Sequence, residues 1–271
     1  HEQTTHIRLS ALSDLTTKLL VSENVGIFVH CAGVAHKKNV SADDFFRVNT
    51  ELTLLLARRA AMAGIKRFIF FSSIGVNGAS SDSPFNAVDS AAPYDAYTES
   101  KYDAENGLKA VSQETGMEVV IIRPPLIYGA NAPGNFARFV KLANIPVPKP
   151  LGSINNKRSF VSVDNLSDFI YLCLKHPGAA NETFLVSDGG DLSTTEFLRK
   201  ISKAMGKPAM LIPFPVSTMR RLASFVGKQE LVDKLAVNLQ VNIERNKTLL
   251  GWEPKVSVDE ALRNALSQEK A

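Results

Sequence analysis

Short apolar runs, separated by longer stretches of mixed polarity, dominate the first half of the chain. Continuous apolar segments of this length, which end in small or turn-forming residues, are typical of strands buried on both faces of a parallel sheet. Three segments fit this description: "VGIFVHCAG" (25–33), "KRFIFFSS" (66–73) and "MEVVIIRPP" (117–125).

Helical patterns occupy the spaces between these runs. Ser41, followed by Asp43 and Asp44, marks the start of a predicted helix that continues through Ala63 and ends at Gly64. A second predicted helix follows a loop rich in Ser, Asp and Pro. Strands that alternate with helices of this length predict an α/β fold, a Rossmann-like, doubly wound parallel sheet with right-handed crossovers.

Beyond residue 130 the alternation becomes less regular. The sequence predicts a helix near 135–144, short strands around "KRSFVSV" and "ETFLVS", and a helix that begins with a Ser193–Glu196 capping box. Several short helices follow. We therefore expect a smaller C-terminal lobe over the sheet edge. The expected dinucleotide-binding domain is 1–130 with the strand and helix near 158–176, and the expected substrate-binding lobe is 131–157 and 177–271.

Composition narrows the class of protein. The chain has 271 residues, of which 45% are hydrophobic and 21% charged, as in a globular protein of one large or two interlocked domains. No apolar run approaches the ~18 residues that span a bilayer. The net charge of +4 is scattered, so no nucleic-acid partner is expected. Cys31 and Cys173 lie in apolar contexts and are interpreted as buried thiols of a cytoplasmic enzyme.

Two histidine-containing stretches are candidate metal sites by residue type. The histidines of "HEQTTH" (1–6) are five residues apart, which places them on different faces of a helix. His30, Cys31 and His36 lack a second pair at ligand spacing, so core packing is the favoured interpretation. No metal is predicted.

The candidate chemistry lies in "AYTESKYDAE" (96–105). Lys101 follows Tyr97 by one helical turn, where its charge favours the phenolate of a residue whose free pKa is near ~10. Ser72 and Ser73 lie where a buried strand ends, and the carboxyl ends of such strands form the ligand-binding edge of an α/β sheet. A serine there could orient the oxygen of a substrate.

These motifs resemble those of the extended short-chain dehydrogenases/reductases, within the nucleotide-sugar epimerase/dehydratase branch, over nearly the whole chain. The resemblance implies that Ser73, Tyr97 and Lys101 are catalytic, and that NAD or NADP is the cofactor. Asn77 stands where most members have Tyr. The expected cofactor-binding residues, besides Tyr97 and Lys101, are Ala32, Gly33, Asn49, Ser72 and Pro124.

The same resemblance extends to a sugar-nucleotide site. "GNFARF" is similar to the turn that holds the diphosphate, which implies Asn135, and "NNKRSFVSVDNLSD" is similar to the stretch whose arginine pairs with it, which implies Arg158. A guanidinium fork suits two phosphates better than an ammonium does. "LLGWEPKVSVDEAL" is similar to the C-terminal signature of the family.

The expected activity is NAD(P)-dependent oxidation and reduction at C4 of a UDP-linked sugar, most simply a UDP-hexose or UDP-N-acetylhexosamine 4-epimerase. A UDP-4-keto-6-deoxy-N-acetylhexosamine reductase would use the same residues. A non-catalytic NAD(P) sensor and a steroid or small-carbonyl dehydrogenase are further alternatives, and Arg158 counts against both. A homodimer is possible.

One expected feature is missing from the sequence. This fold usually begins with a strand and a glycine-rich turn that binds the pyrophosphate at a helix N-terminus. Here the first glycine is Gly26, and the chain would enter the fold at the third strand, "THIRLSA" (5–11), or just after it. We therefore expect an N-terminal strand–turn–helix–strand unit in the intact protein, paired in parallel beside "VGIFVH".

Overall fold

A four-stranded parallel sheet forms the centre of the computed structural model, which describes residues 7–35 and 40–267. The strand order is β1-β2-β3-β6, and all neighbouring pairs are parallel. A smaller parallel pair is formed by β4 and β5. The strands are β1 (Ile27–His30), β2 (Arg67–Phe71), β3 (Glu118–Arg123), β4 (Leu126–Tyr128), β5 (Phe160–Ser162) and β6 (Thr183–Leu185).

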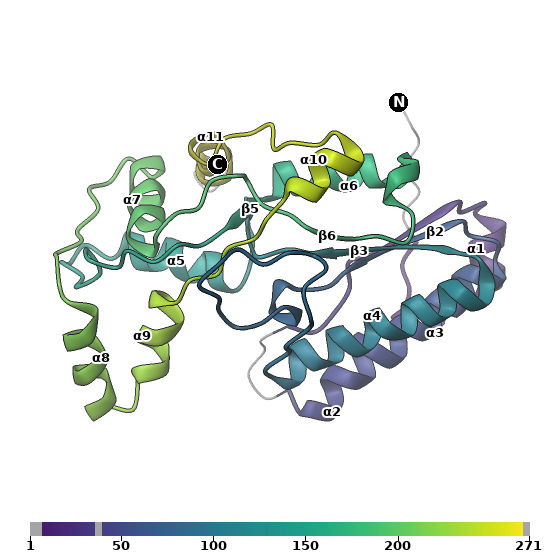
Figure 1. The fold of residues 1–271 in the computed structure, drawn as a ribbon, viewed down its shortest axis with the longest axis horizontal. Coiled ribbons are helices and arrows are strands. Elements are labelled where there is room, and N and C mark those ends of the chain that lie inside the picture. Colours follow the sequence, from purple (N-terminus) through teal and green to yellow (C-terminus); the bar gives the residue numbers. More distant parts are fainter. Residues whose placement is uncertain (1–6, 36–39, 268–271) are drawn as a thin grey trace.

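Helices cover both faces of the main sheet (Figure 1). The α3 and α4 helices lie on one face, and α6 and α10 lie on the other. The helices are α1 (Thr17–Ser22), α2 (Ala42–Phe45), α3 (Leu52–Met62), α4 (Ala96–Thr115), α5 (Asn135–Asn144), α6 (Val163–Lys175), α7 (Thr194–Ala204), α8 (Val216–Phe225), α9 (Gln229–Ala236), α10 (Glu244–Leu250) and α11 (Val258–Ser267). The fold class predicted from the sequence, an α/β Rossmann-like fold with a parallel sheet, is confirmed.

Successive side chains along β2 point to opposite faces of the sheet, so each face has its own apolar core. Phe68 and Phe70 pack with the α3 and α4 side chains, whereas Ile69, between them, packs with α6. The α3 and α4 helices approach closely at Gly107, where an added Cβ would lie 2.6 Å from Leu54 Cδ1. A third apolar cluster, around Phe197, belongs to the smaller lobe and joins β4 to α5, α7 and α11.

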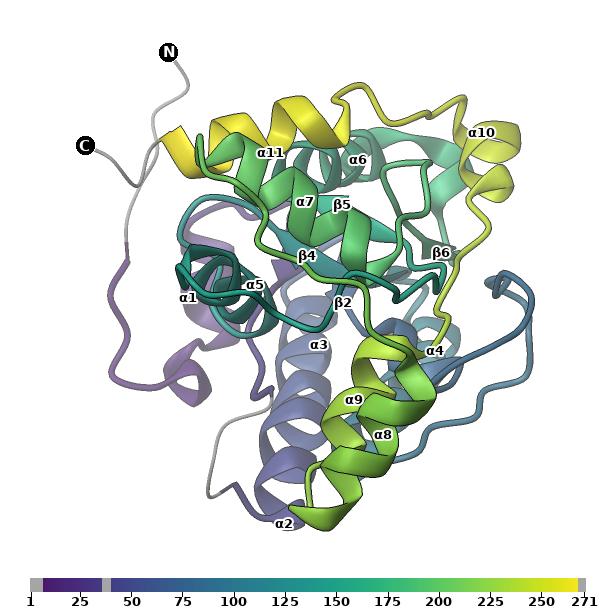
Figure 2. The same ribbon diagram turned by 90° about the vertical axis from the view of Figure 1, so that its left-hand side faces the viewer.

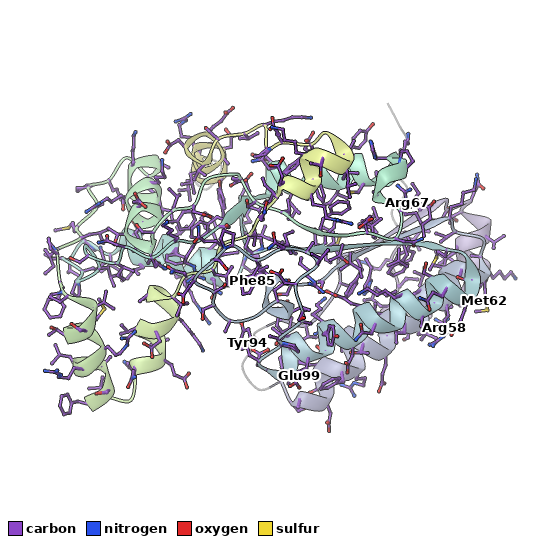
Figure 3. All side chains as sticks on the ribbon, viewed as in Figure 1. Arg58, Met62, Arg67, Phe85, Tyr94 and Glu99 are labelled. Atoms are coloured by element: carbon purple, nitrogen blue, oxygen red, sulfur yellow. The ribbon has the colours of Figure 1, made fainter. Side chains whose placement is uncertain are left out.

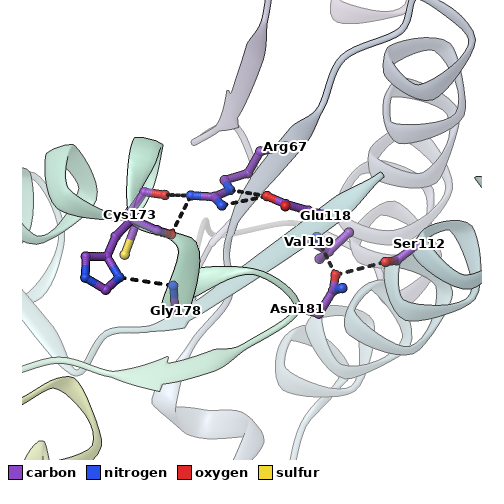
Figure 4. Close-up of polar contacts among 8 residues, drawn as sticks. Arg67, Ser112, Glu118, Val119, Cys173, Gly178 and Asn181 are labelled. Carbon is purple, nitrogen blue, oxygen red and sulfur yellow. Dashed lines mark hydrogen bonds and ion pairs between the residues drawn. The ribbon is translucent and has the colours of Figure 1, made fainter. Parts of the chain in front are cut away.

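Polar contacts tie the amino-terminal edge of the sheet to its covering helix (Figure 4). The buried Arg67 donates from Nε to Glu118 Oε2 at 2.7 Å and from Nη1 to the carbonyl oxygen of Cys173 at 2.6 Å. Asn181, in the left-handed backbone region at φ 60°, accepts from Val119 N at 3.0 Å. This edge is therefore closed by structural contacts, and the opposite, carboxyl edge carries the candidate chemistry.

Most elements follow the sequence prediction, and four details differ. The predicted helix 41–63 is interrupted by a π-helical segment, Phe46–Glu51. Residues 183–185, assigned above to the smaller lobe, form β6 of the main sheet, because an apolar run of three residues carries no periodicity that places it. Cys31 is exposed rather than buried, since β1 ends at His30.

The fourth difference concerns the start of the chain. Residues 7–11 of the predicted third strand are irregular, because no described strand lies beside them to pair with. Among the described residues, β1 is the outermost strand and pairs only with β2. The histidines of "HEQTTH" and His36 lie outside the described residues.

Candidate active site

The candidate catalytic residues gather at the carboxyl edge of the sheet, where β2 ends and α4 begins. Ser73 is the N-cap of a 3₁₀ turn, Ile74–Val76, and its Oγ accepts from Gly75 N at 3.1 Å. A capping box between Asp95 and Thr98 fixes the first turn of α4, which contains Tyr97. Figure 3 marks this end of α4 by Tyr94 and Glu99, with Arg67 at the far end of the sheet.

Tyr97 and Ser73 are brought together as the sequence predicts. Their side chains are hydrogen-bonded, which lowers the pKa of the Tyr97 phenol. Burial of the phenol is the larger effect and raises its pKa above the usual value. Thus the resting site holds Tyr97 as a neutral phenol that shares a hydrogen bond with Ser73.

Lys101 points to the ends of β1 and β2. Its Nζ donates to the carbonyl oxygen of Phe71 at 2.8 Å and lies 4.7 Å from the centroid of the Phe70 ring. Burial lowers the pKa of Lys101 to about 8, and the negative charge of Glu105 opposes this effect. The sequence predicted that Lys101 favours the Tyr97 phenolate; in this structure its nearest partner is a main-chain carbonyl, and burial dominates the pKa of Tyr97.

Gly33 lies close to Lys101 in the loop after β1. A Cβ added to Gly33 would lie 3.1 Å from Asn49 Oδ1 and 3.2 Å from Lys101 Nζ, so a larger residue would crowd both side chains. Asn49 is fully buried and holds the same loop, because its Oδ1 accepts from Val34 N at 2.8 Å and its Nδ2 donates to Val34 O at 3.0 Å. Ala32 lies between β1 and Gly33. Ala32, Gly33, Asn49 and Lys101 thus lie together at the end of β1, and their role in cofactor binding stays a prediction.

Ser72 and Pro124 contribute to the frame of the site. The side chain of Ser72 does not face the sheet edge: its Oγ donates to Glu105 Oε1 at 2.5 Å in the core. The structure therefore places this side chain in the core, and the predicted role of Ser72 in cofactor binding stays a prediction. Pro124, directly after β3, accepts from Ile74 N at 3.1 Å and so fixes the turn that carries Ser73.

Sequence reasoning missed a buried ion pair next to the candidate catalytic residues. Glu105, one turn after Lys101 on α4, binds Arg123 through Nη2 at 2.5 Å and Nε at 2.9 Å. Arg123 Nη1 also donates to Asn77 Oδ1 at 2.9 Å, and Asn77 Nδ2 donates to Asn86 O at 3.0 Å. Residues 97, 101 and 105 follow one another at four-residue spacing on one face of α4. This spacing was the sequence signal that could have indicated a role for Glu105.

Arg158 lies in the smaller lobe at the junction of three chain segments. Its main chain bridges Leu192 and Leu239, and its Nη1 donates to the carbonyl oxygen of Lys234 at 2.7 Å. Burial lowers the pKa of Arg158, and the Tyr94 phenol acts in the opposite direction, so the two side chains lie within electrostatic reach. Tyr94, two residues before α4, also influences the pKa of Tyr97.

Asn135 is the first residue of α5 and is exposed, with its Oδ1 3.3 Å from Arg138 Nη1. No hydrogen bond joins Asn135 to Arg158 in the described ranges. Two surface cavities, of about 590 and 440 Å³, are lined by α6 with α10 and by the start of α7. Neither is lined by Ser73, Tyr97 or Lys101, so the candidate site is defined by its residue geometry.

Comparison with known proteins agrees with this geometry. Residues 4–187 match the NAD dependent epimerase/dehydratase family. This chain belongs to that family. It is 43% identical over 248 residues, 89% of this chain and 76% of the relative, to a UDP-glucose 4-epimerase of Vibrio cholerae.

Two further relatives broaden the comparison. An N-acetyl-alpha-D-glucosaminyl-diphospho-ditrans,octacis-undecaprenol 4-epimerase of Escherichia coli O157:H7 is 26% identical over 74% of this chain and 64% of its own. The crystal structure of a UDP-glucuronic acid 4-epimerase from Bacillus cereus, in complex with NAD, superposes with a TM-score of 0.77 at 17% identity, covering 96% of this chain and 79% of that chain. At 17% identity, the similarity to the Bacillus cereus structure shows a shared fold only.

Proposed function

We propose that the chain is an NAD-dependent 4-epimerase of a UDP-linked hexose or N-acetylhexosamine. The observation that carries this proposal is the 43% identity, over 89% of the chain, to a UDP-glucose 4-epimerase. The hydrogen-bonded Ser73 and Tyr97 and the neighbouring Lys101 supply the chemistry that such a reaction needs.

The residues of this chain account for the movement of the proton. Tyr97, once deprotonated, accepts the proton of the C4 hydroxyl, and Ser73 donates a hydrogen bond to the same oxygen as it becomes a carbonyl. NAD, when bound, accepts the C4 hydride and returns it. Lys101 would hold the nicotinamide ribose beside Gly33, and its charge would stabilise the Tyr97 phenolate. After the keto sugar turns its other face, Tyr97 gives the proton back to the oxygen.

Arg158 is proposed to bind the diphosphate, with Asn135 as a second contact from α5. Arginine suits this role because its planar fork binds two phosphate oxygens at once. The electrostatic contact of Arg158 with Tyr94, three residues before Tyr97, supports a diphosphate site on the same side of the molecule as the proposed catalytic residues.

Two finer expectations belong to the same proposal. The glycine-rich unit expected for the cofactor pyrophosphate would pair with the outer edge of β1, which no described strand covers. A homodimer is the expected assembly, and sedimentation equilibrium of the purified protein measures it.

Product analysis tests the proposed reaction. The protein is incubated with NAD and, separately, with UDP-glucose and UDP-N-acetylglucosamine, and the anomeric proton signals are followed by NMR. We expect a mixture of C4 epimers from at least one sugar, without net consumption of cofactor. Stoichiometric consumption of reduced cofactor with a 4-keto sugar would identify the reductase instead, and no turnover of either kind would contradict the proposal.

A further inference from the structure

Exposed apolar side chains gather on the helical hairpin formed by α8 and α9. Figures 1 and 2 show this hairpin projecting from the smaller lobe, with its two helices side by side. Four large apolar residues, Leu222, Phe225, Val226 and Leu231, are between 56% and 80% exposed. We call these four residues the hairpin patch. A concentration of this kind on a globular protein marks a surface that binds something.

The hairpin patch is not needed for the core of the lobe. Met219 and Val232, one from each helix of the hairpin, are buried in the cluster around Phe197. The turn between the helices contains Gly227 at φ 65°, a conformation that suits glycine. The hairpin is thus anchored by these two side chains, and the four residues of the patch stay exposed.

The hairpin that carries the patch also carries four basic residues. Arg220 pairs with Asp233 at 2.6 Å, and Lys234 pairs with Glu230 at 3.6 Å. Arg221 and Lys228 are exposed, and neither forms an ion pair within the described ranges, so the hairpin carries two uncompensated positive charges. Exposed apolar side chains beside free basic groups are the combination that binds the interface of an anionic bilayer.

The hairpin is also joined to the candidate diphosphate site. Arg158 Nη1 donates to the carbonyl oxygen of Lys234, in the last turn of α9. The next carbonyl, that of Leu235, accepts from Thr194 Oγ1 at 2.7 Å and Asn156 Nδ2 at 3.1 Å. The end of α9 is therefore hydrogen-bonded to the segment that carries Arg158, so a ligand that fixes the hairpin would also fix this segment.

We propose that the hairpin patch docks on an anionic phospholipid bilayer, with Arg221 and Lys228 against the headgroups. Docking would bring Arg158 to the surface of the membrane, within reach of sugar diphosphates carried on a lipid. The relative from Escherichia coli O157:H7 is named for such a lipid-linked sugar. Only this consequence rests on the proposed function; the docking itself does not require turnover.

Vesicle sedimentation tests the docking with the full chain. Vesicles of phosphatidylcholine containing about 30% phosphatidylglycerol are compared with pure phosphatidylcholine, at low and at high salt. We expect binding to the anionic vesicles that weakens with salt. The double variant Leu222→Ser/Phe225→Ser should bind at least about a hundredfold more weakly, because each large apolar side chain contributes at least a factor of about ten when buried. Arg221→Glu/Lys228→Glu should lose the preference for anionic vesicles.

A control variant separates the hairpin patch from surface apolarity in general. Met62, at the end of α3, is 69% exposed, and Met62→Ser should bind vesicles as the wild type does. Absence of wild-type binding, or equal loss in Met62→Ser, would overturn the proposal. A second contradicting result would be a wild-type dimer that does not bind vesicles and that the Leu222→Ser/Phe225→Ser substitutions convert to monomers. In that case a second copy of the chain would cover the patch. Turnover of soluble UDP-sugars should be unchanged in all these variants, so failure of the epimerase assay leaves the vesicle result intact.

Discussion

Glu105 and Arg123 form an ion pair that is almost completely inaccessible to solvent, with Oε2 and Nη2 2.5 Å apart and side-chain exposures of 0% and 4%. Ser72 and Asn77 satisfy further polar atoms of the pair. Since Ser72 precedes Ser73 and Glu105 follows Lys101 on α4, this cluster fixes the end of β2 against the helix that carries the proposed catalytic residues. A buried pair of this kind is costly to break because the remaining charge loses its partner.

Loss of one partner should therefore destabilise the protein strongly. Arg123→Met should lower the free energy of unfolding by about 3–5 kcal/mol, as measured by urea denaturation. Lys247→Met is the matched control, because Lys247 and Glu253 are 2.6 Å apart but 57% and 64% exposed. Its cost should be much smaller, because this pair is exposed to solvent and weakened by screening. Equal effects of the two substitutions would mean that burial of the Arg123 pair contributes nothing.

Removal of the Tyr97 hydroxyl tests the proton-transfer step. Tyr97→Phe should lower turnover by roughly 10²–10⁴-fold and leave the fold intact, because a single acid–base group is lost. Tyr102→Phe, in the next turn of the same helix, should retain wild-type turnover. Circular dichroism and the unfolding midpoint verify that both variants are folded. Near-full activity of Tyr97→Phe would exclude the proposed mechanism.

The sequence predicted the catalytic helix and its serine because local signals determine them. Both the capping residues of α4 and the apolar run before Ser73 can be recognised in the sequence without knowledge of the tertiary structure. The α5 helix was likewise predicted with the bounds found, 135–144. These features depend on residues a few positions apart, and the structure adds only their mutual placement.

Other features depend on contacts between distant residues. Glu105 on a helix surface is read as a solvated charge unless Arg123 is known to lie opposite it. Lys101 shares a helix face with Tyr97, but its rotamer is decided by the Phe71 carbonyl from another element. The hairpin of α8 and α9 was foreseen only as short helices, since exposure of its apolar residues depends on which side the lobe covers.

The diphosphate role of Arg158 predicts a loss of affinity for UDP. Arg158→Ala should weaken UDP binding by ~1.5–3 kcal/mol, the range for a hydrogen bond to a charged group, as measured by titration calorimetry. Arg199→Ala, on α7 in the same lobe, removes an equal charge and should leave UDP affinity unchanged. If Arg158→Ala bound UDP as the wild type does, the diphosphate would have to bind elsewhere.

Because His30 is buried, we expect the protein to be less stable in mild acid than at neutral pH. Burial, reinforced by the charge of Lys101, lowers the pKa of His30 to about 4 from 6.5. Between these two values the unfolded chain binds a proton that the folded chain does not, so stability falls as the pH decreases from about 6.5 to about 4. The difference corresponds to a loss on the order of 3 kcal/mol, since one pKa unit is about 1.4 kcal/mol. His30→Gln, which does not titrate, should lose less stability than the wild type between pH ~7 and ~4.5 in urea denaturation. Parallel curves for the two proteins would show that the folded state can accommodate a charged His30.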